Sequence, residues 1–148
     1  MKRNVESLLS SFAKIRRFYA NELQNKLEGE NLTPNEISIL ILLANNPSIT
    51  TSSQLVYFLQ VSKGLVSRSI DGLVKKGLVQ CMPDDKDHRV QRITLTKDSK
   101  IVTSKITKEA RKINERILKD ISEDEIIQME NTISKIIERF ESEGRKNV

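Results

Sequence analysis

Apolar residues recur at every third or fourth position near both ends of this chain, the spacing that places them on one face of an α-helix. Residues 3–28 and residues 102–117 each predict one such amphipathic helix. A last helix is expected to open at Ser122, because Glu125 can complete a capping box with that serine. A helix of about 22 residues spans roughly 33 Å, more than a small domain covers by itself. We therefore expect these helices to pack partly on a second subunit, the alternative being that they fold back on their own core. The residues predicted at that contact are Leu8, Phe12, Ile15, Ile113, Ile117, Ile133, Ile137 and Phe140.

The middle of the chain predicts two short, well-capped helices joined by a tight turn, after an apolar helix that follows Thr33. Thr51 is followed three residues later by a glutamine, as in a capping box, and Ser62 can cap the second helix. That helix is expected to end at Lys75 and Lys76, followed by Gly77 in the left-handed conformation. This arrangement is a helix-turn-helix, whose second helix contacts base edges with residues near its N-terminus.

The second helix has one apolar and one polar face. The apolar face is predicted to consist of Val66, Ile70, Leu73 and Val74. On the polar face, Lys63 and Arg68 can donate to guanine and Ser67 can donate or accept, so these residues suit the major groove. Gly64 lacks a side chain and would let DNA approach closely. An ordinary solvated helix surface has the same composition, and this alternative stays open for the helix pair alone.

Residues 78–82 and 90–95 predict two short strands joined by a polar loop. A hairpin beside a helix-turn-helix can place an arginine in the minor groove, where the negative potential is strong. Arg89 is the candidate, with Asp87 as its orienting partner, and Arg92 is placed to contact phosphate. The alternative for Arg89 is an ordinary surface ion pair with Asp87.

The run SKGLVSRSIDGLVKKGLV, which begins at Ser62, followed by DDKDHRVQRITLT, resembles the MarR (multiple-antibiotic-resistance regulator) family of bacterial winged-helix transcription factors. The resemblance spans nearly the whole chain. It implies a homodimeric repressor of transcription that releases DNA when a small molecule, such as a phenolic or other aromatic compound, binds. It also implies that Arg89 enters the minor groove and that Asp87 holds it. Two residues depart from the family pattern: His88 replaces a frequent second arginine, and Ser99 replaces a common glycine.

We therefore predict a mainly α-helical chain with a small β-hairpin, an α+β fold class. Residues 1–148 would form one domain, with a winged helix-turn-helix core at residues 30–96 and helical dimerisation regions at residues 1–29 and 97–148. Two-fold pairing would place two recognition helices about 10 base pairs apart on double-stranded DNA, which predicts a palindromic operator. The predicted DNA-binding residues are Thr51, Ser52, Ser62, Lys63, Gly64, Ser67, Arg68, Lys75, Lys76, Asp87, Arg89 and Arg92.

The net charge of +5 is uneven, which agrees with phosphate contact. Residues 61–100 contain nine basic and five acidic side chains, residues 1–29 contain six and three, and residues 101–148 contain ten of each. A basic region could also serve an anionic membrane surface, but no basic amphipathic helix with aromatic anchors supports that alternative. No apolar run approaches the roughly 20 residues that span a bilayer, and no signal-peptide core follows the N-terminus. We expect a cytoplasmic protein.

Other chemistries find less support. Asp84, Asp85, Asp87 and His88 share one loop and could hold a nuclease metal, but hairpin tips rarely fix such geometry. We predict no catalytic residue, no metal ligand and no cofactor, and we keep a protein-interaction module without specific DNA binding as the alternative function. The single cysteine, Cys81, could be a redox sensor, but we interpret it as a small apolar residue of a strand, because lone cysteines are commonly buried. An anion could meet Arg16, Arg17 and Tyr19, although a solvated helix face is the simpler interpretation.

Overall fold

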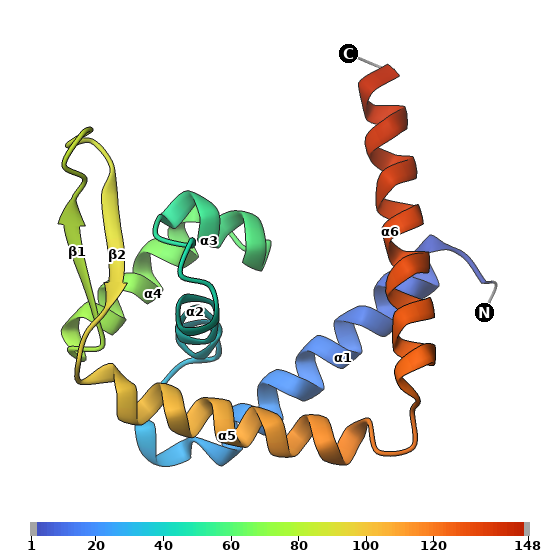
Figure 1. Cartoon of the computed structure of the whole chain (residues 1–148), viewed down its shortest axis with the longest axis horizontal. Coiled ribbons are helices and arrows are strands. Elements are labelled where there is room, and N and C mark those ends of the chain that lie inside the picture. Colours follow the sequence, from blue (N-terminus) through green and yellow to red (C-terminus); the bar gives the residue numbers. More distant parts are fainter. Residues whose placement is uncertain (1–2, 147–148) are drawn as a thin grey trace. The chain divides into compact units, whose positions relative to one another are not determined.

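Six α-helices, one short 3₁₀ helix and one hairpin make up the part of the chain that the structure describes, residues 3–146 of a computed structural model. Contacts divide the chain into two compact units, one up to residue 111 and one from residue 112. In order, the elements are α1 (Val5–Lys26), η1 (Glu28–Glu30), α2 (Pro34–Asn45), α3 (Ser52–Leu59), α4 (Lys63–Lys75), β1 (Val79–Pro83), β2 (Gln91–Leu95), α5 (Ser99–Ile117) and α6 (Glu123–Lys146) (Figure 1). The predicted fold class is confirmed, whereas the single domain over residues 1–148 stays a prediction.

The core of the first unit surrounds α2, which packs against α1, α3, α4 and β2. Ile39 and Leu40 of α2, Leu55 of α3 and Leu73 of α4 have no exposed surface, and Ile93 of β2 is almost completely buried. Burial of each such side chain contributes roughly 1.5–3 kcal/mol. This core fixes the helix-turn-helix to the hairpin.

The predicted helix caps are confirmed. The hydroxyl of Thr51 accepts a hydrogen bond from the amide of Gln54 at 3.3 Å, and the hydroxyl of Ser62 accepts one from the amide of Leu65 at 3.1 Å. Gly77 has a φ of +73°, the left-handed conformation expected after α4. The turn between α3 and α4 depends on Gln60, whose φ is +55°.

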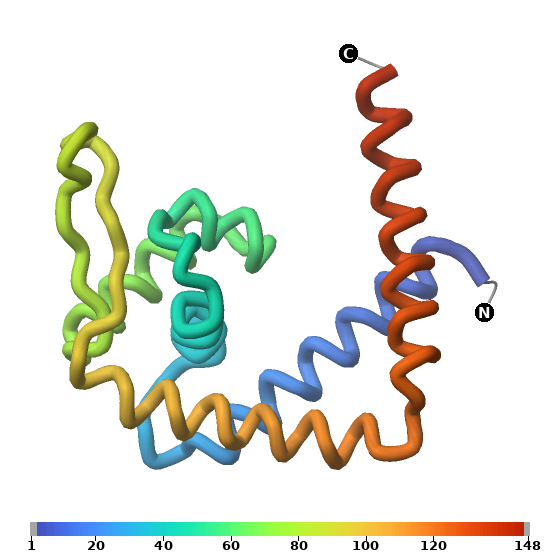
Figure 2. Tube along the Cα trace, in the orientation of Figure 1, coloured from blue at the N-terminus to red at the C-terminus, as the bar shows by residue number. Residues whose placement is uncertain are grey.

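The hairpin is antiparallel, with Val79 opposite Leu95 and Pro83 opposite Gln91, and Figure 2 shows its extended course. The sequence places Leu78 and Val90 in the strands, but both strands begin one residue later. The amide of Leu78 donates to the carbonyl of Leu73 at 3.0 Å and so closes the end of α4. The amide of Val90 donates to the carbonyl of Asp87 at 2.9 Å and so closes the loop.

Two apolar side chains that the sequence places inside are exposed. Val74 is 43% exposed, whereas Val66, Ile70 and Leu73 are buried as predicted. One residue advances about 100° around a helix, so Val74 turns away from the face that Leu73 defines. Cys81 is also exposed, because β1 extends beyond the core after its first residue. The expected place of Cys81 in a strand is confirmed, whereas its expected burial is wrong.

The helix α1 is anchored to the first unit only near its C-terminal end. Leu23 and Leu27 are 3% and 2% exposed, whereas Leu8, Phe12 and Ile15 are 40%, 39% and 63% exposed. The start of α5 belongs to the same unit, where the ammonium of Lys105 lies 2.9 Å from the carboxylate of Glu30. The first half of α1 thus leaves an apolar face uncovered.

In the second unit, α6 begins as the sequence predicts. The amide of Glu125 donates to the hydroxyl of Ser122 at 3.1 Å, and the amide of Ser122 donates to the carboxylate of Glu125 at 2.8 Å. No residue of α6 is buried within its described length, and Ile137 and Phe140 are 50% and 60% exposed. None of the helices within residues 3–146 is both long enough and apolar enough to cross a membrane.

Candidate nucleic-acid interface

The N-terminal half of α4 presents its polar side chains to solvent. Lys63, Gly64, Ser67 and Arg68 are all exposed, while Val66 between them is 1% exposed and anchors the helix. Ser62, which is also exposed, caps the helix and so stabilises its first turn. The structure therefore brings these five predicted residues onto one accessible helix end, where hydrogen-bond donors can reach the edges of base pairs.

The side chain of Arg68 extends back over Gly64 on this face. A methyl group built at Gly64 would lie 3.4 Å from Nη1 of Arg68, an ordinary van der Waals contact. The guanidinium of Arg68 therefore lies over Gly64, as expected for side chains that point back toward the helix N-terminus. This orientation places a planar, bidentate donor at the exposed start of α4.

The beginnings of α3 and α4 face a common hollow of about 190 Å³. Ser52 and Ser53 of α3 line it together with Val56 and with Lys63 of α4. The first amides of a helix have no partner within the helix, and the helix dipole makes this end positive. Together with the Lys63 ammonium, these groups suit an anion. The sequence alone indicates Ser52 and Lys63 but not Ser53 and Val56, whose positions follow from the i, i+1 and i+4 geometry of α3.

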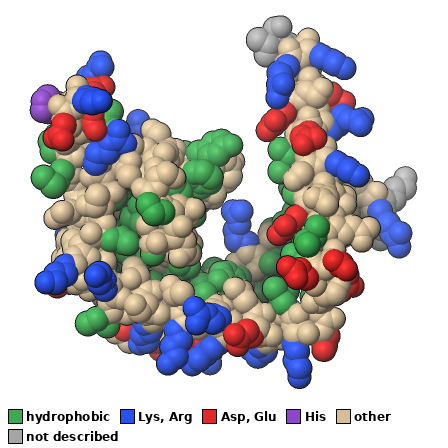
Figure 3. All heavy atoms as spheres, viewed as in Figure 1, with side chains coloured by type: hydrophobic (Ala, Val, Ile, Leu, Met, Phe, Trp, Pro, Cys, Tyr) green, Lys and Arg blue, Asp and Glu red, His purple; other side chains and the backbone are tan. Residues whose placement is uncertain are grey.

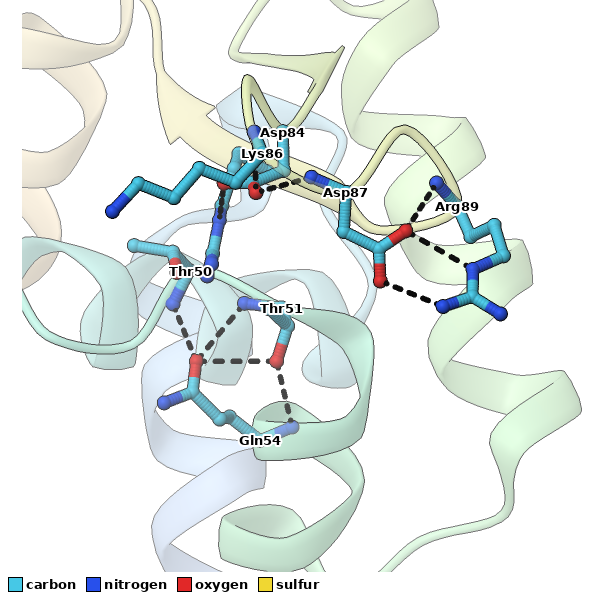
Figure 4. A network of polar contacts seen from close by, with 8 residues as sticks. Thr50, Thr51, Gln54, Asp84, Lys86, Asp87 and Arg89 are labelled. Carbon is cyan, nitrogen blue, oxygen red and sulfur yellow. Dashed lines mark hydrogen bonds and ion pairs between the residues drawn. The ribbon is translucent and has the colours of Figure 1, made fainter.

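At the tip of the hairpin, Asp87 orients Arg89 as predicted. The carboxylate of Asp87 accepts hydrogen bonds from Nε and Nη2 of Arg89, at 3.0 and 3.3 Å, and from the Arg89 amide at 3.1 Å. These hydrogen bonds hold the pKa of the Asp87 carboxyl below its ordinary value. The Arg89 side chain is 90% exposed, and Figure 4 shows its guanidinium turned toward the Asp87 carboxylate at the outer side of the loop. Its remaining donors are available to a partner.

Two hydrogen bonds fix the side chain of Arg92, which is 45% exposed, on the protein surface. Its Nε donates to Oδ1 of Asp84 at 2.9 Å, and its Nη1 donates to the hydroxyl of Thr50 at 2.7 Å. The sequence interpretation of Arg92 as a phosphate contact does not include either partner. Thr50 is a functional candidate that the sequence alone does not indicate, because it lies 42 residues from Arg92 in the chain. Asp84 is indicated by the sequence only as a metal ligand, and its contact with Arg92 appears in the structure.

The two lysines at the end of α4 have different surroundings. The ammonium of Lys76 lies 2.7 Å from the carboxylate of Glu36, which is 2% exposed, so Lys76 takes part in a partly buried ion pair. Lys75 is exposed. Both lie about 18 Å along the helix from Lys63 and are not part of the group at the start of α4.

Acidic and basic side chains alternate at the tip of the hairpin, as Figure 3 shows. Asp84 and Asp87 bind Arg92 and Arg89, respectively. Within residues 3–146, no three His, Cys, Asp or Glu side chains are grouped so that they could hold a metal ion. The loop geometry is that of ion pairs between the acids and the arginines.

Cys81 lies on β1 near this interface. Partial desolvation and the negative charge of Asp71 raise the pKa of its thiol. Because the thiolate is the reactive form, the raised pKa of the Cys81 thiol disfavours its oxidation at neutral pH. Two of the three α1 residues considered for an anion have distinct surroundings in the structure. The guanidinium carbon of Arg17 lies 5.2 Å from the ring centre of Phe18, and burial raises the pKa of Tyr19.

Comparison with known proteins gives a consistent result. Residues 32–91, which include α2, α3, α4, β1 and the first residue of β2, match the model of the MarR family. The structure is similar to that of the transcriptional regulator BldR from Sulfolobus solfataricus, with a TM-score of 0.76 and 24% identity over 94% of this chain and 99% of that one. A MarR transcriptional regulator from Methanosarcina mazei gives a TM-score of 0.76 and 22% identity over 93% and 98% of the two chains. Wild-type MarR from Escherichia coli, in its apo form, gives 0.67 and 20% over 92% and 98%.

No curated protein sequence matches the chain. The solved structures just described show the fold, and the family model supplies the sequence relationship. Residues 32–91 are thus similar in sequence to the MarR family, and the chain has the fold of the winged-helix transcriptional regulators just described.

Proposed function

We propose that the chain is a homodimeric transcriptional repressor of the cytoplasm that binds a palindromic operator and releases it when a small molecule binds. The observation that supports this proposal best is the exposed group at the start of α4, Lys63, Ser67 and Arg68, beside a hairpin that presents Arg89. A helix of this kind fits the major groove, and an exposed arginine on a wing fits the minor groove.

Each residue of the interface has a different proposed role. Arg68 and Lys63 donate to guanine, and Ser67 donates to or accepts from a base edge. Thr51, Ser52, Ser62 and the adjoining helix amides contact phosphate, which fixes the register without specifying sequence. Lys75 contributes to phosphate attraction, and Arg89 senses the width of the minor groove.

Two exposed apolar surfaces support the proposal that the chain forms a homodimer. One lies on α1 and contains Leu8, Phe12 and Ile15. The other contains Ile117 at the end of α5 with Ile137 and Phe140 of α6, and includes the half-buried Ile133. Exposed apolar groups of this extent are typical of protein contacts. Ile113 of α5 is proposed at the same contact and is 4% exposed in the single chain.

A groove of about 520 Å³ supports the proposal that a small-molecule effector binds to the protein. It is lined by Ala44, Asn45, Thr103, Ser104, Thr107, Lys108 and Arg111. Its two cationic side chains and its hydroxyl groups suit an aromatic compound with an acidic group. Such a compound releases DNA only if it binds the free protein more tightly than the DNA-bound arrangement.

A binding titration tests the proposal. Purified protein is added to labelled duplex from the DNA that flanks its gene and to a scrambled duplex, at physiological salt. We expect at least about a thousandfold preference for one duplex, the lower end for specific regulators. Arg68→Ala should then weaken discrimination at one base-pair position by about 1–3 kcal/mol. Equal, weak binding to every duplex would instead support a protein-interaction module.

A further inference from the structure

The hairpin is connected to the start of α3 by side chains far apart in the sequence. Arg92 of β2 donates to Asp84 at 2.9 Å and to the Thr50 hydroxyl at 2.7 Å. The Ile93 amide also donates to the carbonyl of Thr50 at 2.7 Å. Thr50 therefore receives both a side-chain and a main-chain hydrogen bond from β2.

Thr50 is itself fixed to α3. Oε1 of Gln54 accepts hydrogen bonds from the amides of Thr50, at 2.8 Å, and of Thr51, at 3.1 Å. Figure 4 shows Gln54 beneath these two residues at the first turn of the helix. A displacement of the hairpin would therefore disturb the same turn that caps α3.

At its other end, the connection reaches Arg89. Oδ2 of Asp84 accepts hydrogen bonds from the amides of Lys86, at 3.1 Å, and Asp87, at 3.0 Å, and so shapes the loop. Asp87 in turn holds the guanidinium of Arg89. The hydrogen bond from Arg92 is the main reason why the pKa of Asp84 lies below its ordinary value, so the carboxylate stays ionised at neutral pH.

We propose that Thr50, Asp84 and Arg92 are positioning residues, which fix the hairpin against α3 and thereby determine where Arg89 meets DNA. This inference rests on the proposed function. In it, Arg92 holds the hairpin against α3 through Asp84 and Thr50, whereas the sequence alone indicates a phosphate contact. It also assigns a favourable effect on DNA binding to Asp84, an acid whose charge by itself repels DNA.

A positioning role for Asp84 and a simple repulsion between its charge and DNA predict changes of opposite sign for the operator affinity of Asp84→Asn. The amide side chain retains one oxygen, so it cannot accept both from Arg92 and from the loop amides. If Asp84 positions Arg89, affinity for the operator falls about fivefold, the factor that corresponds to the upper end for an exposed ion pair. If only charge matters, affinity rises. The matched control is Asp85→Asn, which removes an equal charge from an exposed neighbour that makes no ion pair within the described residues, and which should raise affinity.

Thr50→Val provides a second variant without a change of charge. Valine has nearly the shape of threonine but cannot accept the hydrogen bond from Arg92. We expect a similar loss of affinity with the salt dependence unchanged, since no phosphate contact is removed. An unchanged affinity would overturn the inference.

The test is completed by repeating Asp84→Asn and Thr50→Val in an Arg89→Ala protein, with circular dichroism to verify folding. If both residues act through Arg89, neither change weakens binding further in that background. An equal loss in both backgrounds would overturn the positioning role. A wild-type protein without preference for any duplex would overturn the proposed function and this inference together, whereas specific wild-type binding with unaffected variants would overturn the inference alone.

Discussion

A methyl group added at Gly72 tests the packing of α4 against α2. The new Cβ would lie 2.6 Å from Oε2 of Glu36 and 3.5 Å from its Cδ, so the carboxylate would have to move. Glu36 is buried, and its other oxygen accepts hydrogen bonds from Lys76 at 2.7 Å and from the Thr33 amide at 2.8 Å. Movement of the carboxylate therefore strains the ion pair and the cap of α2 together.

The change in the free energy of unfolding caused by Gly72→Ala is the balance of two opposing effects. Alanine is better than glycine in a helix interior by about 1 kcal/mol. Overpacking of a filled site costs about 1–3 kcal/mol, and weakening of a hydrogen bond to a charged group adds to this cost. We expect Gly72→Ala to lower the free energy of unfolding by about 1–2 kcal/mol, although the change favours the helix locally.

Urea unfolding followed by circular dichroism measures this effect, with Gly64→Ala as the matched control in the same helix. At Gly64 the added methyl meets only the end of the flexible Arg68 side chain, at 3.4 Å, so stability should be equal or higher. In a Glu36→Ala background the space is open, and Gly72→Ala should become stabilising. A Gly72→Ala protein at least as stable as wild type would refute the proposed packing.

Three further predictions concern charge and association. Burial alone would raise the pKa of Glu36, but hydrogen bonds from Lys76 and the α2 cap outweigh it and hold the pKa below its ordinary value. The ionised pair therefore stabilises the fold at neutral pH, and this contribution should disappear as pH falls through the ordinary glutamate range and then through the lowered pKa. Glu36→Gln should reduce this pH dependence in urea titrations, and an identical pH profile would contradict the assignment. Lys75→Ala should reduce the slope of log affinity against log salt by about one, whereas Lys76→Ala should mainly lower stability; the reverse pattern would exchange their roles. Phe12→Asp should shift the sedimentation coefficient from dimer to monomer, and an unchanged dimer would exclude that face of α1 from the contact.

Features that depend on neighbours in the sequence could be predicted. The caps at Thr51 and Ser62 require only a side chain and an amide three residues away, and Gly77 follows from the left-handed conformation after a helix. The pair formed by Asp87 and Arg89 is also local. These features gave the helix-turn-helix, the hairpin and the orientation of the hairpin arginine.

Features that depend on the tertiary fold could not be predicted. The partners of Lys76 and Arg92, Glu36 and Thr50, lie 40 and 42 residues away in the sequence. Periodicity also cannot show how wide the covered face of a helix is, so it assigns Val74, next to the buried Leu73, to the interior, although Val74 is 43% exposed. A basic residue near a recognition helix suggests phosphate, but only its neighbours show whether its donors are already used.

The central claim is that α4 recognises specific sequence and that two copies recognise it together. Selection of bound duplexes from a random pool, followed by a footprint on the enriched sequence, tests this claim most directly. We predict one inverted repeat, with half-site centres about 10 base pairs apart and one dimer bound. A pool that shows no enrichment, or a single unrepeated site bound by one chain, would contradict it.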